Sequence, residues 1–163
     1  MITKALAPRL RLRLEPVITP MYRTWWRMKR GMTLGVRGVA VDAENRVVMV
    51  RHTYRAGWYL PGGGVESGET LVQAVTKEMH EEAGVYAVSQ PRLFGMYSNH
   101  ANYKNDHVAL FVFDDWREGP VTQDGEIAEI GRFPIDALPE GATKSTHARL
   151  AELFSGCPID VHW

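Results

Sequence analysis

The feature that most constrains this chain is a glycine-rich segment followed directly by a helix-forming segment with grouped acidic residues. The glycines are Gly62–Gly64, and the apolar periodicity predicts a helix from about Thr70 to Ala83. Gly84 follows, and a residue without a Cβ suits the left-handed conformation that ends many helices. The segment therefore predicts a tight turn joined to a helix with defined ends.

The predicted helix has two chemically different faces. Glu78, Glu81 and Glu82 share one face, because residues three and four positions apart lie over one another on a helix. A separate apolar stripe contains Val72, Val75, Met79 and Ala83. We therefore expect the helix to pack against a core with one face and to present carboxylates with the other.

Grouped carboxylates favour a bound cation. Two such charges repel by roughly 4 kcal/mol at 4 Å when the effective dielectric constant is near 20. Carboxylate oxygens suit Mg²⁺ or Mn²⁺, which also accept phosphate oxygens and can activate water for attack. The alternative is a solvated face in which Lys77 and Glu81 form an ion pair, as in most charged helices.

Composition limits the class of protein. A chain of 163 residues with 45% hydrophobic and 23% charged residues predicts one globular catalytic domain. Its net charge of zero combines eight Lys/Arg and one acidic residue in residues 1–31 with an acidic remainder. That acidic body would repel a polyphosphate unless a cation intervened. The single cysteine, Cys157, excludes an internal disulfide and fits a reducing compartment, so we expect a cytoplasmic protein.

The basic N-terminal part reads as an extension of residues 1–31. Residues 9–14 alternate between Arg and Leu and predict a short strand, and residues 21–30 have the spacing of an amphipathic helix. We expect Trp25 and Trp26 to cover the sheet or a homodimer partner. A membrane surface or nucleic acid is the less favoured partner, because the basic tract is short. No apolar run is long enough for a transmembrane helix, and no secretory signal is evident.

The remaining elements predict an α/β fold. Strands are expected at 34–41, 46–51, 92–97, 108–113 and 127–133, with a turn at 42–45 and a final helix at 145–154. Glu118-Gly-Pro marks a further turn. One internal and one terminal helix around these strands predict a helix–sheet–helix layered arrangement.

The segment Gly63–Val85 resembles the Nudix box: a Gly, five residues, a Glu, seven residues, then Arg-Glu-apolar-x-Glu-Glu-x-Gly-apolar. Every defined position matches except that Lys77 stands in place of the arginine, which replaces a planar fork by a point charge. The flanking segments Leu60–Gly63 and Arg132–Pro139 are also similar to the family, so the resemblance covers about residues 34–155. It implies a Nudix-like fold with a mixed sheet, in a domain of residues 32–163.

The resemblance also implies roles for individual residues. Glu78 and Glu82 are the expected principal ligands of Mg²⁺, with Mn²⁺ as an alternative, and Glu81 is a further ligand or the general base. The carbonyl of Gly62 and a carboxylate before the last strand would complete the site, with Glu126 as first choice and Asp124 as second. Structural support is expected from Gly63, Glu69 and Lys77.

Candidate substrate-binding residues flank the glycine-rich segment. Arg51 and Arg55 are expected to clamp phosphates, or else to be solvated charges. A nucleobase could stack on Trp58, Tyr54 or Tyr97, although aromatic residues near strand ends more often pack in a core. The histidines show no metal-ligand spacing, so structural or surface roles are expected for them.

These features predict a metal-dependent hydrolase that cleaves a diphosphate linkage in a nucleoside diphosphate linked to another group. Candidate substrates are dinucleotide cofactors, nucleotide sugars, ADP-ribose and damaged nucleoside triphosphates. The alternative is a non-catalytic nucleotide-sensing module on the same fold, for which missing box glutamates would be the sign; all are present. Capped RNA, and nucleic acid generally, is not expected as substrate, because the body of the chain is acidic.

Overall fold

The computed structural model describes residues 31–122 and 125–163. The described strands are β1 (Thr33–Ala40), β2 (Arg46–His52), β3 (Val85–Ala87), β4 (Arg92–Ser98), β5 (Asp106–Phe113), β6 (Trp116–Glu118) and β7 (Ile127–Pro134). The described helices are α2 (Leu71–Ala83) and α3 (Lys144–Phe154). The predicted strand at 9–14 and helix at 21–30 lie outside the described residues.

The central sheet is mixed, as the sequence predicted. It has the order β1-β5-β4, in which β1 and β5 are parallel and β4 and β5 are antiparallel. β2 pairs with β7 antiparallel, and the register shifts between Arg51 and His52. β3 and β6 form a separate two-stranded pair. Parallel pairing of strands so far apart in sequence requires a long crossover, and the segment containing α2 lies within it.

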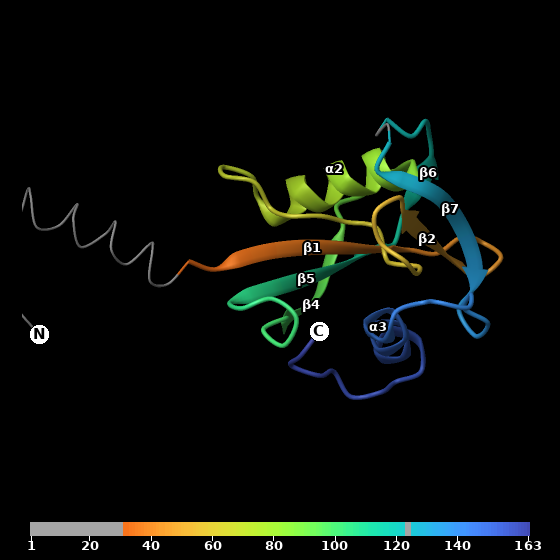
Figure 1. Ribbon diagram of the computed structural model, residues 1–163. Helices are drawn as coiled ribbons and strands as arrows, with labels where there is room; N and C mark the ends of the chain where they lie inside the picture. Colours follow the sequence, from red (N-terminus) through yellow and green to blue (C-terminus); the bar gives the residue numbers. More distant parts are fainter. Residues whose placement is uncertain (1–30, 123–124) are drawn as a thin grey trace, which may run out of the picture. The chain divides into compact units, whose positions relative to one another are not determined.

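The two helices cover opposite sides of the central sheet (Figure 1). One core cluster joins α2 to the sheet through Ala74, Val75 and Met79, all of which are fully buried. The other contains Leu150 of α3 and Tyr97 of β4. This is the helix–sheet–helix arrangement expected from the sequence, and it leaves the carboxylate face of α2 directed to the edge of the sheet.

Both ends of α2 are fixed by local hydrogen bonds. Thr70 accepts from the backbone N–H of Gln73, and the Gln73 side chain accepts from the N–H of Thr70, which completes a capping box. Gly84 ends the helix with φ 62°, and its N–H donates to the carbonyl of His80. These bonds set the start and the rotation of the helix, and therefore the direction in which its glutamates point.

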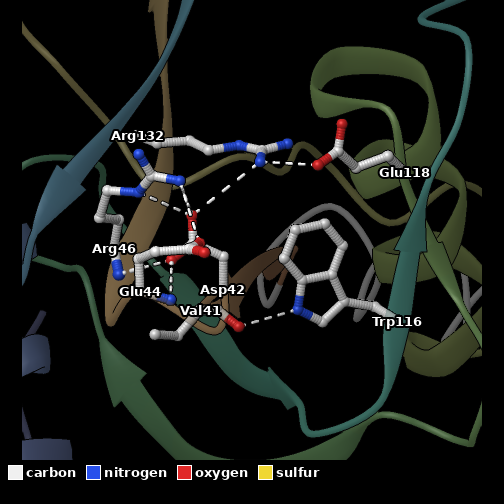
Figure 2. Close-up of polar contacts among 7 residues, drawn as sticks. All are labelled: Val41, Asp42, Glu44, Arg46, Trp116, Glu118 and Arg132. Carbon is white, nitrogen blue, oxygen red and sulfur yellow. Dashed lines mark hydrogen bonds and ion pairs between the residues drawn. The ribbon is translucent and has the colours of Figure 1, made fainter.

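A polar cluster ties the turn after β1 to β6 and β7 (Figure 2). The Arg132 guanidinium lies 2.7 Å from Glu118 and 3.9 Å from Asp42. The indole N–H of Trp116 donates to the carbonyl of Val41 at 3.1 Å. Because these partners come from β6, β7 and the turn after β1, the cluster holds the two small sheets against the end of β1.

The sequence did not predict β3 or β6, since strands of three residues are too short to show a period. In particular, Glu118 belongs to β6 rather than only to a turn. Helix α3 begins one residue earlier than expected, at Lys144. Among residues 31–122 and 125–163, no helix combines the length and apolar character needed to cross a bilayer.

Candidate metal and diphosphate site

A cavity of about 1070 Å³ opens beside the glycine-rich loop. Its walls come from that loop, from the carboxylate face of α2, from the first residues of β1 and β5, and from the beginning of α3. The glycine-rich loop runs along β1, because the N–H of Val36 donates to the carbonyl of Gly63 and the N–H of Gly38 to that of Pro61. The edge of the sheet therefore becomes one rim of the cavity.

Glu82 is fixed by the backbone of the glycine-rich loop. Its Oε2 accepts a hydrogen bond of 2.8 Å from the N–H of Gly62, and the side chain is only 5% exposed. Burial raises the pKa of Glu82 to about 7, while the Gly62 hydrogen bond and the nearby Arg37 oppose that rise. The group is therefore poised between its protonated and ionised forms near neutral pH.

Glu78 lies directly over the backbone of Gly63. A Cβ added to Gly63 would stand 2.6 Å from Oε1 of Glu78, so any side chain at this position would displace that carboxylate. Burial raises the pKa of Glu78, and the charge of Lys77 opposes that rise. Gly62 has φ 140°, a conformation that favours glycine, and a Cβ there would collide with the carbonyl oxygen of Val36. Gly63 thus allows the loop to approach α2 closely, and Gly62 allows it to approach β1.

Arg37 of β1 is a site residue that the sequence reasoning missed. Its guanidinium donates to the carbonyl of Leu60 at 3.1 Å and to the carbonyl of Gly62. Burial lowers the pKa of Arg37, and the charges of Glu82 and Glu78 oppose that shift. The signal available was a charged residue inside a strand whose neighbours, Val36 and Gly38, are core-like.

His52, at the end of β2, is also part of the cavity wall. Its side chain is 3% exposed, and Nδ1 lies 4.0 Å from Oε1 of Glu82, too far for a hydrogen bond. No described residue is a hydrogen-bond partner of that nitrogen. Burial lowers the pKa of His52, and the charges of Arg37 and Arg55 lower it further. His52 is therefore a neutral imidazole beside the carboxylate at neutral pH.

Lys77 joins the glycine-rich loop to α2. Its ammonium donates to Glu69 at 2.8 Å and to Glu66 at 3.0 Å. The hydrogen bond from Lys77 lowers the pKa of Glu69, and the same two carboxylates raise the pKa of Lys77. Glu69 also accepts from the N–H of Glu66. A point charge on a flexible stem thus binds both glutamates at once, and the alternative pair of Lys77 with Glu81 is not formed.

The other expected ligands are placed differently. Glu126 lines the cavity and raises the pKa of Glu82 by its charge. Asp124 lies outside the described residues. Glu81 is half-buried and close enough to affect the pKa of Glu78, but it is not part of the cavity wall.

The expected substrate-binding residues divide into two groups. Arg55 and Tyr54 line the cavity. Arg51 instead pairs with Glu129 at 2.6 Å, and Trp58 packs edge-on against Phe133 with ring centroids 4.7 Å apart; neither forms part of the cavity wall. The third aromatic candidate, Tyr97, is fully buried in the core.

The donor set fits a hard divalent cation. The carboxylates of Glu78 and Glu82 lie against the backbone of Gly63 and Gly62, and Glu126 lines the same cavity. The Gly62 carbonyl accepts from Arg37 and has a second lone pair that a cation could use. Mg²⁺ prefers a few such oxygens and completes its shell with water and phosphate. Across 31–122 and 125–163, no three His, Cys, Asp or Glu side chains form a ready-made cluster for a metal. Substrate oxygens would therefore have to supply part of the coordination.

Comparison with known proteins identifies the family of this chain. The model of the NUDIX domain matches residues 32–154. YjhB of Bacillus subtilis, named as a candidate ADP-ribose pyrophosphatase, is 32% identical over 73% of this chain and 59% of its own length. An RNA pyrophosphohydrolase of Francisella tularensis is 40% identical over 35% of this chain and 37% of its own length. The chain therefore spans little more than half of YjhB and a smaller part of the Francisella protein.

Solved structures agree on the fold. A MutT NUDIX hydrolase from Burkholderia pseudomallei superposes with a TM-score of 0.62, at 23% identity, over 74% of this chain and 97% of that one. The region matched by the NUDIX family model, residues 32–154, includes the glycine-rich loop, α2 and α3. Because the family model matches about three quarters of the chain and the fold is shared, this chain belongs to the Nudix family.

Proposed function

We propose that this chain is a divalent-metal-dependent pyrophosphohydrolase that cleaves a phosphoric anhydride in a nucleoside diphosphate linked to another group. The strongest support is that four residues lie close together at the rim of a cavity of about 1070 Å³: Arg37, Gly62, Glu78 and Glu82. Carboxylates, a carbonyl and a guanidinium are the groups that diphosphate hydrolysis needs close together.

Each residue has a definable task. Glu82 and the Gly62 carbonyl would hold Mg²⁺ or Mn²⁺, with Glu78, Glu81 and Glu126 as the other oxygen donors. When bound, the metal would neutralise phosphate charge and make water easier to deprotonate. Arg37 and Arg55 carry positive charge at the cavity and would bind phosphoryl oxygens. We assign no phosphate contact to Arg51, because Glu129 already pairs with it.

Of the two α2 carboxylates in the cavity wall, Glu78 is better placed than Glu82 to accept a proton from the attacking water. Glu82 already accepts the Gly62 N–H and is the more deeply buried. Burial raises the pKa of both groups, so the preference for Glu78 rests on its geometry. Lys77, Glu66 and Glu69 hold the loop against the helix and so fix the distance between Gly62 and both glutamates.

The experiment that tests this function is a substrate panel read by phosphate release and product mass. It should contain ADP-ribose, nucleotide sugars, dinucleotides, nucleoside triphosphates and a 5′-triphosphate RNA, each with Mg²⁺, with Mn²⁺ and with chelator. We expect turnover of at least one small nucleotide with metal and none with chelator. Glu82→Gln serves as the inactive reference, and equal turnover by wild type and Glu82→Gln would refute the assignment.

We place the protein in a reducing compartment, the cytoplasm, because Cys157 is a free, exposed thiol. The proposed partner is a nucleotide-derived small molecule. A homodimer formed through the basic residues 1–31 stays a prediction, which size-exclusion chromatography with light scattering would test.

A further inference from the structure

The segment that follows α3 supplies a wall of the cavity far from the glutamates. Trp163 lines the cavity, and its N–H donates to the carbonyl of Ser98 at 3.0 Å, while the N–H of Ser98 donates to Val161 at 2.8 Å. The segment therefore runs beside β4, at the edge opposite β1 (Figure 1). Because neighbouring strands lie about 4.8 Å apart, three spacings place the backbone of this segment about 14 Å from that of β1.

The cavity crosses this distance on the α3 side of the sheet. Arg37 and Val108 both line it. Their partners on the neighbouring strands are Leu110 and Tyr97, respectively, and both partners belong to the core cluster facing α3. Because paired residues point to the same side of a sheet, Arg37 and Val108 also lie on the α3 side. One end of the cavity therefore holds the carboxylates and Arg37, and the other end holds Trp163. A ligand that contacts both ends must be elongated.

A buried ion pair holds Trp163 in place. Arg149 of α3 is 2% exposed; it lies 2.6 Å from Glu152 and donates to the carbonyl of His162 at 2.6 Å. Glu152 also accepts from the N–H of Asp160 at 2.9 Å and from the hydroxyl of Tyr97 at 2.9 Å. Each of the two charged residues therefore binds the backbone of the segment 160–163.

The same ion pair shapes the surroundings of the indole. The Arg149 guanidinium stands 4.1 Å from the ring centroid of Tyr97 and 5.7 Å from that of Trp163. The two rings meet edge-on at 5.6 Å. Burying an ion pair carries a desolvation cost that stability alone seldom justifies. Here its hydrogen bonds fix a segment whose last residue, Trp163, lines the cavity.

The polar groups near Trp163 indicate which class of ligand could bind beside it. Asn102 lines the cavity from the loop between β4 and β5, Asp106 from the start of β5, and Ser145 from the start of α3. These side chains already bond to Thr33, Asn99 and Thr143 within the fold, and each keeps further hydrogen-bonding capacity. A planar heterocycle offers a face to the indole and hydrogen-bonding atoms along its edge for that capacity, whereas an aliphatic chain offers neither. We propose that Trp163 is the stacking surface for the nucleobase of the substrate, and that Arg149 and Glu152 are its positioning residues.

This inference rests on the proposed function for the presence of a nucleotide, but it is tested by binding alone. The full chain is titrated with the four nucleoside 5′-monophosphates and with ribose 5-phosphate, which differs from them only in lacking the base. These probes contain no phosphoric anhydride and are not consumed. Isothermal titration or ligand-observed NMR gives the dissociation constants.

We expect at least one nucleoside monophosphate to bind at least tenfold more tightly than ribose 5-phosphate. Trp163→Leu keeps apolar bulk but removes the aromatic face, so it should weaken that nucleotide about tenfold and leave ribose 5-phosphate unchanged. Trp163→Phe should keep most of the affinity. Phe154→Ala, which removes an exposed ring of α3 outside the cavity wall, should change neither ligand.

Three results would overturn the inference: no nucleotide preferred over ribose 5-phosphate, unchanged nucleotide affinity in Trp163→Leu, or an equal loss for both probes. If Trp163→Leu does not fold, as judged by its thermal transition, equal nucleotide affinities of Trp163→Phe and wild type support stacking. A Trp163→Phe variant reduced to the level of ribose 5-phosphate refutes it. If Trp163 does not affect nucleotide binding but the protein hydrolyses a nucleotide with metal, the stacking inference is refuted and the proposed hydrolase function is retained. If binding depends on the base and on Trp163 but no substrate is hydrolysed, the stacking inference is retained and the hydrolase function is refuted.

Discussion

The backbone N–H of Gly62 donates to the carboxylate of Glu82 across 2.8 Å, so that a loop and a helix turn meet at one hydrogen bond. The bond occupies Oε2 and leaves Oε1 directed toward His52, 4.0 Å away. Because Glu82 is also buried, its rotamer is set before any ligand arrives. A carboxylate held in this way is preorganised for a cation, which reduces the entropy lost on binding.

We predict that Glu82→Gln and Glu78→Gln each lower turnover by about a hundredfold or more, equivalent to roughly 2.7 kcal/mol of barrier. Glutamine keeps the size of the side chain but removes the charge that a cation needs. Thermal stability should be unchanged or slightly higher, since a buried charge is removed. Glu44→Gln, in the exposed turn after β1, is the matched control and should retain wild-type turnover.

Metal dependence can be measured without substrate. Mn²⁺ binding followed by electron paramagnetic resonance should show one or more sites in wild type and a clear loss of affinity in Glu82→Gln, because the donors are hard oxygens. Turnover should vanish in excess chelator and return on addition of Mg²⁺. Full activity in chelator would contradict the proposed role of the glutamates.

Lys77→Arg should keep or raise the rate. A guanidinium can bind Glu66 and Glu69 with its fixed fork, where the ammonium now makes one hydrogen bond to each. Lys77→Met should instead release the loop from α2 and lower kcat. The thermal midpoint should change little, since the ion pairs of Lys77 with Glu66 and Glu69 are partly exposed. A large loss in Lys77→Arg would show that the site is built around the shape of lysine.

The raised pKa of Glu82 predicts a pH-dependent stability for the metal-free protein. Its folded-state pKa of about 7 exceeds the ordinary value of 4.5, so the folded state binds more protons between these values. The stabilising contribution is present below pH 4.5 and is lost as pH rises through 7, by about 3 kcal/mol at most. Chemical denaturation in chelator at several pH values should show this loss as a difference between wild type and Glu82→Gln.

A carboxylate that binds a cation must be ionised, so Mg²⁺ should release a proton from the protein near pH 6.5 and remove most of this pH dependence. Calorimetric titration of Mg²⁺ in two buffers of different ionisation enthalpy measures the released protons. Identical apparent enthalpies in both buffers would count against a protonated Glu82 at that pH.

Arg149→Met should destabilise the protein by about 3–5 kcal/mol, because it leaves the buried charge of Glu152 without its partner. Glu152→Gln combined with Arg149→Met should recover part of that loss, since no unpaired charge remains. Thermal unfolding of both variants measures the difference. If the single variant were as stable as wild type, the buried pair would have no structural role.

The sequence predicted the main elements because their signals are local. The apolar stripe of α2 and the positions of Thr70 and Gly84 determine where that helix starts and ends. The alternation and apolar runs of the long strands are equally local. β3 and β6 were missed because each has only three residues and is stabilised by pairing with the other strand. That pairing joins distant parts of the chain, so no local stretch of sequence reveals it.

The site was predicted only as far as its residues lie within one motif. Arg37 was missed because its role depends on the glycine-rich loop running beside β1, with the Pro61 and Gly63 carbonyls bonded to that strand. Trp163 was missed for a similar reason, since its place in the cavity depends on hydrogen bonds with Ser98 of β4. The burial of Glu82, by contrast with Glu81 beside it, also follows from contacts across the fold.

The hydrogen bonds of Trp163 to Ser98 and of its segment to Arg149 leave the glycine-rich loop and α2 untouched. Residues near Trp163 can therefore change during evolution without altering the geometry of Glu78 and Glu82. A lineage with this architecture can exchange one preferred nucleobase for another through mutations after α3 while the hydrolytic machinery stays constant. Libraries that randomise the segment 157–163 should therefore yield altered substrate preference with folding and metal binding retained.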